Sequence, residues 1–179
     1  MTAVLDVAVL GQELDWSVMD TYQSRPLRVD SERALVSLIS RHLRRNWPVR
    51  GIGYEVSTHG RSRADLCVAM RDAEGAECFI AVEAKLDNWS RAIRQAGLNR
   101  RAVDISFVAV PIQVVNPSMV YAASSLGVGI LGIGHSACVV SLGASLSAPD
   151  GTLRERVRSQ LGRVRPRGAL GVQTLVGGG

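Results

Sequence analysis

The chain has 179 residues, of which 46% are apolar and only 4% aromatic, so it can bury an aliphatic core in one domain. Its apolar runs stay short of the ~20 residues that cross a bilayer, and its N-terminus has no basic segment before its apolar stretch, so we expect a cytoplasmic protein rather than a membrane or secreted one. The three cysteines are far apart and show no CxxC spacing, which argues against a zinc site or a disulfide framework.

Positive charge is concentrated near the C-terminus. Residues 1–150 contain 15 Lys+Arg and 15 Asp+Glu, whereas residues 151–179 contain six arginines and one glutamate and so supply the whole net charge of +5. Such a cluster suits a phosphate backbone, although a solvated tail is the alternative. The candidate nucleic-acid contacts in this cluster are Arg154, Arg156 and Arg158.

Hydrophobic periodicity and turn residues predict alternating helices and strands after an irregular or weakly helical lead-in at residues 1–29. The expected elements are a helix at 30–46, strands at 52–57, 63–70 and 77–85, a helix at 87–101, a strand at 104–111, a helix at 117–126, strands at 127–134 and 137–142, and a basic helix at 152–162. This order predicts an α/β fold with a mixed central sheet flanked by helices. The domain is expected to span residues 30–148, followed by a basic, Gly-rich tail at 149–179.

Charged residues interrupt two of the predicted apolar strands. Glu83 and Lys85 follow the apolar residues 79–82, and strand alternation predicts that their side chains share a face. Asp65 lies in the preceding apolar strand, and the predicted hairpin brings it close to Glu83. Two carboxylates held together repel unless a divalent cation or a proton lies between them, and Mg²⁺ accepts carboxylate and carbonyl oxygens as ligands. The pattern therefore predicts a magnesium site.

Lys85 is also distinctive by composition. Of the 21 cationic residues, 20 are arginine and Lys85 is the single lysine. Lysine is a compact point charge whose pKa burial can lower, whereas arginine does not deprotonate in proteins. The position of this lysine beside two carboxylates makes it a candidate catalytic residue.

Two predicted helices carry further candidates. Glu32 lies in the middle of the apolar face of the first helix, so it is a candidate third acid, although a first-turn carboxylate also complements the helix dipole. On the helix at 87–101, Arg91, Gln95 and Asn99 form a polar stripe beside the apolar one. This stripe could line a cleft and contact a phosphate or an attacking water, and an ordinary solvated helix face would have the same pattern.

Residues 30–111 resemble the PD-(D/E)XK nuclease superfamily, whose αβββαβ core carries Asp and (Asp/Glu)-x-Lys on adjacent strands. Ala64-Asp65 matches the first motif, with alanine in place of proline, and Glu83-Ala84-Lys85 matches the second. Glu32 is similar to the acid that many members carry on the first helix. Gln95 resembles a glutamine motif of resolvase-like members, although the tyrosine often found four residues later is absent.

The resemblance implies a restriction-endonuclease-like core and a metal-dependent nuclease. Asp65 and Glu83, with the Ala84 carbonyl, would hold Mg²⁺, for which Mn²⁺ would substitute. Lys85 would orient or help deprotonate the attacking water, and Glu32 would join through water or bind a second ion. Gln95 would complete the catalytic residues.

The expected function is therefore hydrolysis of DNA phosphodiester bonds, by a homodimer or by a chain with a protein partner. The alternative is an inactive nuclease-fold protein that binds DNA or acts as a scaffold in a complex. RNA cleavage is a third possibility, because such a site acts on any phosphodiester and specificity resides in loops. Residues 127–132 (GVGILG) match GxGxxG, but a predicted helix precedes them and a strand follows, which is the reverse of a dinucleotide-binding unit.

Overall fold

The computed structural model describes residues 27–71, 75–134, 138–142 and 144–163, and within them helices alternate with strands. The elements are α2 (Glu32–Asn46), β1 (Gly51–Ser57), β2 (Arg63–Arg71), β3 (Glu77–Ala84), α3 (Trp89–Asn99), β4 (Ile105–Pro111), the 3₁₀ turn η2 (Ile112–Val114), α4 (Pro117–Ser125), β5 (Gly129–Ile133), β6 (Cys138–Leu142), α5 (Gly151–Gln160) and β7 (Gly162–Arg163). The predicted order of a helix, three strands, a helix and a strand is confirmed. The predicted lead-in lies outside the described residues as far as residue 26.

The strands form one mixed sheet in the order β6-β5-β4-β3-β2-β1-β7. Strands β1, β2 and β3 are antiparallel, β3, β4 and β5 are parallel, and the outer strands β6 and β7 are antiparallel to their neighbours. The hairpin predicted between β2 and β3 is present, and Gly75 in its connection has a φ of 84°, which glycine adopts without strain. The α/β class with a mixed sheet flanked by helices is therefore confirmed.

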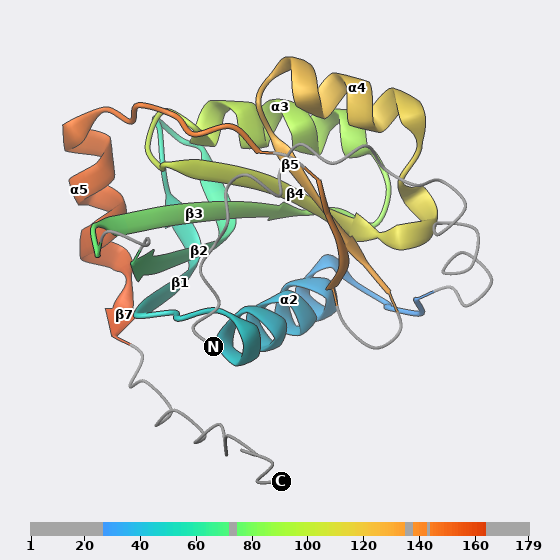
Figure 1. Cartoon of the computed structure of the whole chain (residues 1–179), viewed down its shortest axis with the longest axis horizontal. Helices are drawn as coiled ribbons and strands as arrows, with labels where there is room; N and C mark the ends of the chain where they lie inside the picture. The colour runs from blue at the N-terminus through green and yellow to red at the C-terminus, as the bar shows by residue number, and fades with distance from the viewer. Residues whose placement is uncertain (1–26, 72–74, 135–137, 143, 164–179) are drawn as a thin grey trace, which may run out of the picture.

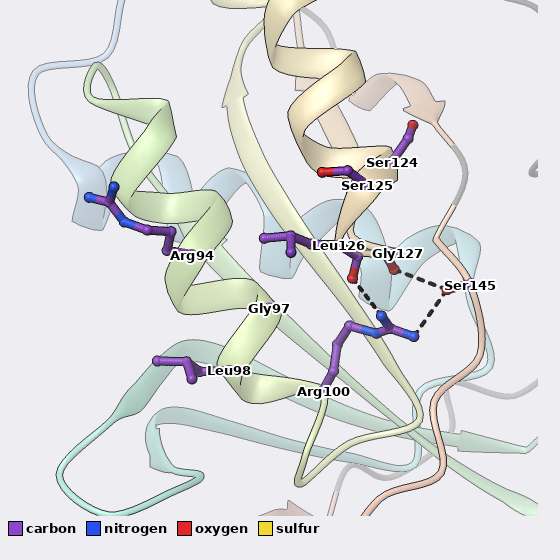
Figure 2. A pocket seen from close by; sticks show the side chains of 9 residues that line it. All are labelled: Arg94, Gly97, Leu98, Arg100, Ser124, Ser125, Leu126, Gly127 and Ser145. Carbon is purple, nitrogen blue, oxygen red and sulfur yellow. Dashed lines mark hydrogen bonds between the residues drawn. The ribbon is translucent and has the colours of Figure 1, made fainter.

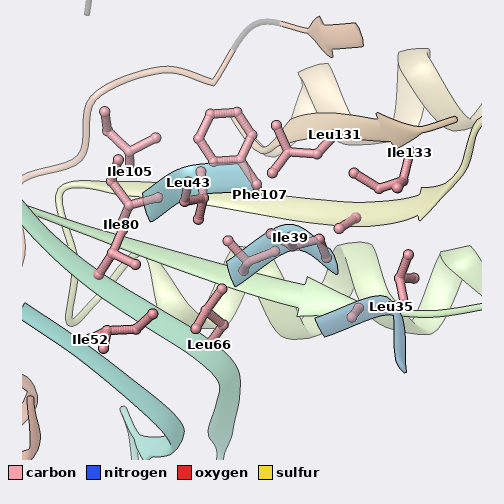
Figure 3. Close-up of a cluster of buried hydrophobic side chains, with 14 of the residues drawn as sticks. Leu35, Ile39, Leu43, Ile52, Leu66, Ile80, Ile105, Phe107, Leu131 and Ile133 are labelled. Atoms are coloured by element: carbon pink, nitrogen blue, oxygen red, sulfur yellow. The ribbon is translucent and has the colours of Figure 1, made fainter. Parts of the chain in front are cut away.

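Helices cover both faces of the sheet, with α2 on one and α3 and α4 on the other (Figure 1). Ser31 begins α2, since its Oγ accepts a hydrogen bond from the Ala34 N–H at 3.2 Å. Leu35, Ile39 and Leu43 follow at intervals of four and are at most 1% exposed, because this stripe packs on the central strands (Figure 3). Among the described residues no helix is long and apolar enough to cross a membrane.

The strands β1 and β2 change face where they pass two acidic residues. Ile52 packs in the cluster under α2, whereas Val56, which regular alternation would place on the same face, packs in the cluster under α5. In β2, likewise, Leu66 packs in the cluster under α2 and Ala64 packs in the cluster under α5. Glu55 lies at this point of β1 with a φ of 51°, a left-handed conformation that is rare for residues other than glycine. Asp65 lies at the corresponding point of β2.

The segment after residue 149 is part of the fold as far as Arg163. Helix α5 lies beside the β1 edge of the sheet (Figure 1), and its Val157 side chain is fully buried. Strand β7 pairs with β1 through Gly51 and Ile52. The predicted basic helix at 152–162 is confirmed, and within the segment predicted as a tail α5 and β7 pack against the sheet as far as residue 163. The rest of that tail lies outside the described residues.

Candidate active site

Strands β2 and β3 end their pairing beside Asp65. Backbone pairing of the two strands runs as far as Leu66 with Val82, and beyond it the Ala84 N–H donates to Asp65 Oδ2 at 2.8 Å. The carboxylate therefore takes the place of a strand carbonyl. Because the N–H and C=O of one strand residue face the same neighbour, the Ala84 carbonyl also faces β2. Asp65 and the Ala84 main chain are thus brought together, as the sequence predicts.

Glu83 is buried on the side of α3. Its side chain is 1% exposed, and Oε1 accepts a hydrogen bond from Asn99 Nδ2 at 2.7 Å. Asn99 Oδ1 in turn accepts from Thr58 Oγ1 at 2.7 Å, and Thr58 and Asn99 are both fully buried. The sequence predicts Asn99 as a surface contact for nucleic acid, but the structure buries its side chain fully. Its amide faces inward because the carboxylate of Glu83 needs a donor inside an apolar layer.

Lys85 turns to the other helix layer. Its Nζ pairs with Glu32 Oε2 at 2.6 Å, and the two side chains are 19% and 43% exposed. The prediction that Glu83 and Lys85 point the same way is wrong, because β3 ends at Ala84 and Lys85 lies beyond the regular alternation. Glu32 lies in the first turn of α2, so this ion pair joins the start of that helix to the end of β3.

The charges of these residues act on one another. Burial, and then the charge of Asp65, raises the pKa of Glu83 to about 8, while Asn99 and Lys85 act in the opposite direction. Burial also raises the pKa of Asp65, against the hydrogen bond from Ala84 and the charge of Lys85. At neutral pH and without a cation, Glu83 is thus largely protonated. A cation placed between these carboxylates would lower both pKa values and favour the ionised form of Glu83.

Lys85 remains an ammonium group in this setting. Burial lowers its pKa, but the hydrogen bond and charge of Glu32, together with the charges of Asp65 and Glu83, outweigh burial and raise it. A lysine with a raised pKa does not accept a proton from water at neutral pH. The geometry therefore favours a role in orienting water or stabilising negative charge over a role as base.

Glu55 is an acidic residue of this region that sequence reasoning missed. The β1–β2 register pairs Tyr54 with Leu66 and places Glu55 across from Asp65. The charge of Glu55 contributes to raising the pKa of both Asp65 and Glu83. In the sequence Glu55 looks like an exposed strand residue, and only the pairing of β1 with β2 reveals its position.

The oxygen donors present suit a hard divalent cation. Asp65 and Glu83 offer carboxylate oxygens and Ala84 a carbonyl oxygen, the donors that Mg²⁺ accepts while it keeps several waters. Within the described part of the chain, no group of three or more His, Cys, Asp or Glu side chains is arranged to hold an ion. Glu32, a further predicted metal ligand, forms an ion pair with Lys85, and its role toward a metal stays a prediction.

Two further residues of α3 are predicted to belong to the site: Gln95 as a catalytic residue and Arg91 as a nucleic-acid contact. No contact in the described part of the chain assigns either of them a role. Gln95 is half-buried, and its Oε1 atom is buried with no hydrogen-bond partner among the described residues. Arg91 is exposed in the first turns of α3. Both remain predictions.

The arginines of α5 are engaged by acids of the sheet. Arg154 pairs with Asp104 at 3.0 Å and lies 4.6 Å from the centre of the Phe79 ring, and Arg158 pairs with Glu77. Both arginines are thus paired with carboxylates of this chain, and their role as phosphate contacts stays a prediction. The third arginine of that prediction, Arg156, is exposed.

A separate groove lies between α3 and α4 (Figure 2), with a volume of about 820 Å³. Arg100 crosses it, donating to the Leu126 carbonyl at the end of α4 and to Ser145 Oγ at 3.0 Å. These contacts tie the segment after residue 143 to the end of a helix, where carbonyl groups lack partners. The groove contains none of the acids described above.

No protein-family model and no curated protein matches the sequence. Among solved structures, SPO1766 of Silicibacter pomeroyi, a protein of unknown function, aligns with a TM-score of 0.55 and 17% sequence identity. The alignment covers 75% of this chain and 85% of that chain. At this identity the likeness shows a shared fold and nothing about activity.

Proposed function

We propose that this chain is a Mg²⁺-dependent nuclease with a restriction-endonuclease-like core, which hydrolyses phosphodiester bonds of DNA. One observation carries the proposal: burial raises the pKa of both Asp65 and Glu83, the charge of Asp65 raises that of Glu83 further, and the charge of the single lysine of the chain acts on both. A buried carboxylate is costly unless a cation or a hydrogen-bond network compensates it. Acids whose pKa values are raised by burial and by neighbouring charges are typical of functional sites.

The ion would be held by Asp65, Glu83 and the carbonyl of Ala84. When bound, it would act as a Lewis acid toward a phosphate oxygen and lower the pKa of a water ligand. The fit rests on the hard oxygen donors and on the pKa of Glu83, which is raised where no cation offsets its burial. Glu83 would release its proton as the ion binds.

Lys85 would orient the attacking water and stabilise negative charge on the phosphate. Glu32 holds the ammonium group at 2.6 Å and keeps it protonated, which suits charge stabilisation. Glu32 is thus a positioning residue for Lys85 in this proposal. Arg91, exposed near the start of α3 and six residues after Lys85, is the arginine best placed along the chain to contact the DNA backbone.

The test is cleavage of supercoiled plasmid and of single-stranded DNA with Mg²⁺ or Mn²⁺, and with EDTA as the metal-free control. Asp65→Asn and Lys85→Met should each reduce cleavage by 100-fold or more, about the loss expected when a group that stabilises the transition state is removed. Glu77→Gln is the matched control, because it removes a carboxylate from the other end of β3. Its activity should stay close to that of the native chain.

Two results would contradict the proposal. Cleavage that survives EDTA, or that is equal in the Asp65 and Lys85 variants, would come from another site or a contaminant. Binding of DNA without cleavage by the native chain would favour the alternative, a nuclease-fold protein that binds DNA or acts as a scaffold. Purification of every variant by the same route makes the comparison valid.

A further inference from the structure

Three polar side chains form a buried row on the α3 side of the sheet. Thr58 and Asn99 are fully buried and Glu83 is 1% exposed, and the row is joined by two hydrogen bonds of 2.7 Å. Each such group destabilises the fold if it is buried without a hydrogen-bond partner. A row of three in a layer of mostly apolar side chains therefore calls for a physical reason.

The direction of the hydrogen bonds fixes the orientation of the Asn99 amide. The Thr58 hydroxyl lies 2.7 Å from Asn99 Oδ1 and 3.4 Å from the Ser62 carbonyl, so its one proton goes to the nearer acceptor, Oδ1, and Nδ2 is the end of the amide that faces Glu83. With the amide reversed, Oδ1 would face Glu83 Oε1, and the two acceptors would repel whenever Glu83 is ionised, as it would be with a cation bound. Thr58 is itself anchored in the turn after β1, where its N–H donates to the Ser62 carbonyl at 3.1 Å.

A neutral amide suits a carboxylate that has to bind a cation. Asn99 satisfies one oxygen of Glu83 by a hydrogen bond and leaves the negative charge of the carboxylate in place. An arginine or lysine in the same position would also satisfy that oxygen, but its charge would compete with a metal ion. The bond holds Oε1, so Oε2 is the oxygen left for a ligand.

We propose that Asn99, oriented by Thr58, is a positioning residue that ties Oε1 of Glu83 and presents Oε2 to the divalent ion. This inference rests on the proposed function, because it assigns to Glu83 the role of metal ligand. Thr58 contacts neither the ion nor DNA and acts only through Asn99. Hydrogen bonds of this kind orient metal ligands, and their loss commonly weakens metal binding or activity by 10–100-fold.

The experiment measures Mn²⁺ binding by titration calorimetry and the Mn²⁺ dependence of plasmid cleavage in the same full-length variants. Thr58→Val removes the hydroxyl while keeping the shape of the side chain, and Thr58→Ser is its matched control because it keeps the hydroxyl. We expect Thr58→Val to raise the Kd for Mn²⁺ about 10-fold and Thr58→Ser to bind as the native chain does. Cleavage by Thr58→Val should recover at saturating Mn²⁺, a response that a merely destabilised protein would not give.

Asn99→Leu is the direct variant and should weaken Mn²⁺ binding at least as much. If it fails to fold, Thr58→Val still tests the inference, because that change leaves Asn99 and Glu83 in place. Native affinity in Thr58→Val, or equal affinity in Thr58→Val and Thr58→Ser, would overturn the positioning role while leaving the nuclease proposal standing. A native chain that neither binds Mn²⁺ nor cleaves DNA would overturn both.

Discussion

Replacement of Glu83 by glutamine should stabilise the metal-free protein at neutral and alkaline pH. Glutamine keeps an oxygen to accept the hydrogen bond from Asn99 and has no charge to bury. Burial and the charge of Asp65 raise the pKa of Glu83 from its ordinary value of 4.5 to about 8 in the fold. Each pKa unit corresponds to about 1.4 kcal/mol, so charged Glu83 reduces the stability of the native chain by about 5 kcal/mol.

The sign follows from where the proton is held. Between pH 4.5 and about 8 the folded chain keeps the Glu83 proton that the unfolded chain has lost, so stability falls as pH rises through this window. Below the window Glu83 is neutral in both states and resembles glutamine. The advantage of Glu83→Gln should therefore be near zero at pH 4, about 3 kcal/mol at pH 7, and about 5 kcal/mol above pH 9.

Urea unfolding in EDTA at a series of pH values measures this difference directly. Glu155→Gln is the control, since it removes a carboxylate whose side chain is 62% exposed and should change stability by less than about 1 kcal/mol. Parallel stability curves for the native chain and Glu83→Gln across pH 4–9 would refute the reasoning. Such curves would mean that the pKa of Glu83 is the same in the folded and the unfolded chain.

Three other changes test the surroundings of the site in the same unfolding assay. Glu55→Gln should move the stability transition of Glu83 to lower pH, because the charge of Glu55 helps to raise that pKa; an unmoved transition would place Glu55 too far away to matter. Val157→Ala should cost about 2 kcal/mol, since this side chain is fully buried under α5, and a native-like stability would show that α5 is not docked. Arg154→Ala should cost about 1 kcal/mol through its lost ion pair and ring contact, whereas Arg156→Ala, at an exposed position of the same helix, should be nearly neutral; equal effects would contradict the packing of Arg154.

The sequence predicted the elements well because their signals are local. Ser31, followed by apolar residues that recur every four positions, predicts where α2 begins. The glycine-containing turn around Gly75 predicts the β2–β3 hairpin. That hairpin in turn places Asp65 near the end of β3, as the structure shows through the bond to the Ala84 N–H. Where a side chain points depends on more than alternation, and the prediction for Lys85 failed because the strand stops one residue earlier.

The sequence does not predict the surroundings of residues whose partners come from distant segments. Asn99 looks like part of a solvated stripe until the turn after β1, which carries Thr58, covers it. Arg154 and Arg158 look like a free basic cluster until α5 docks against Glu77 and Asp104. A single sequence does not reveal such partners, because each contact joins residues that are more than 40 positions apart along the chain.

By itself the sequence determined the α/β class, the order of the elements and the pairing of an acidic strand with an acid-x-lysine strand. These follow from hydrophobic periodicity and turn chemistry, which act between near neighbours. Only the tertiary structure decided that Glu55 lies across from Asp65, that Asn99 is an inward-facing partner of Glu83, and that α5 belongs to the core. Burial, and with it the pKa of a carboxylate, is set by the segments that pack around a residue rather than by those that adjoin it.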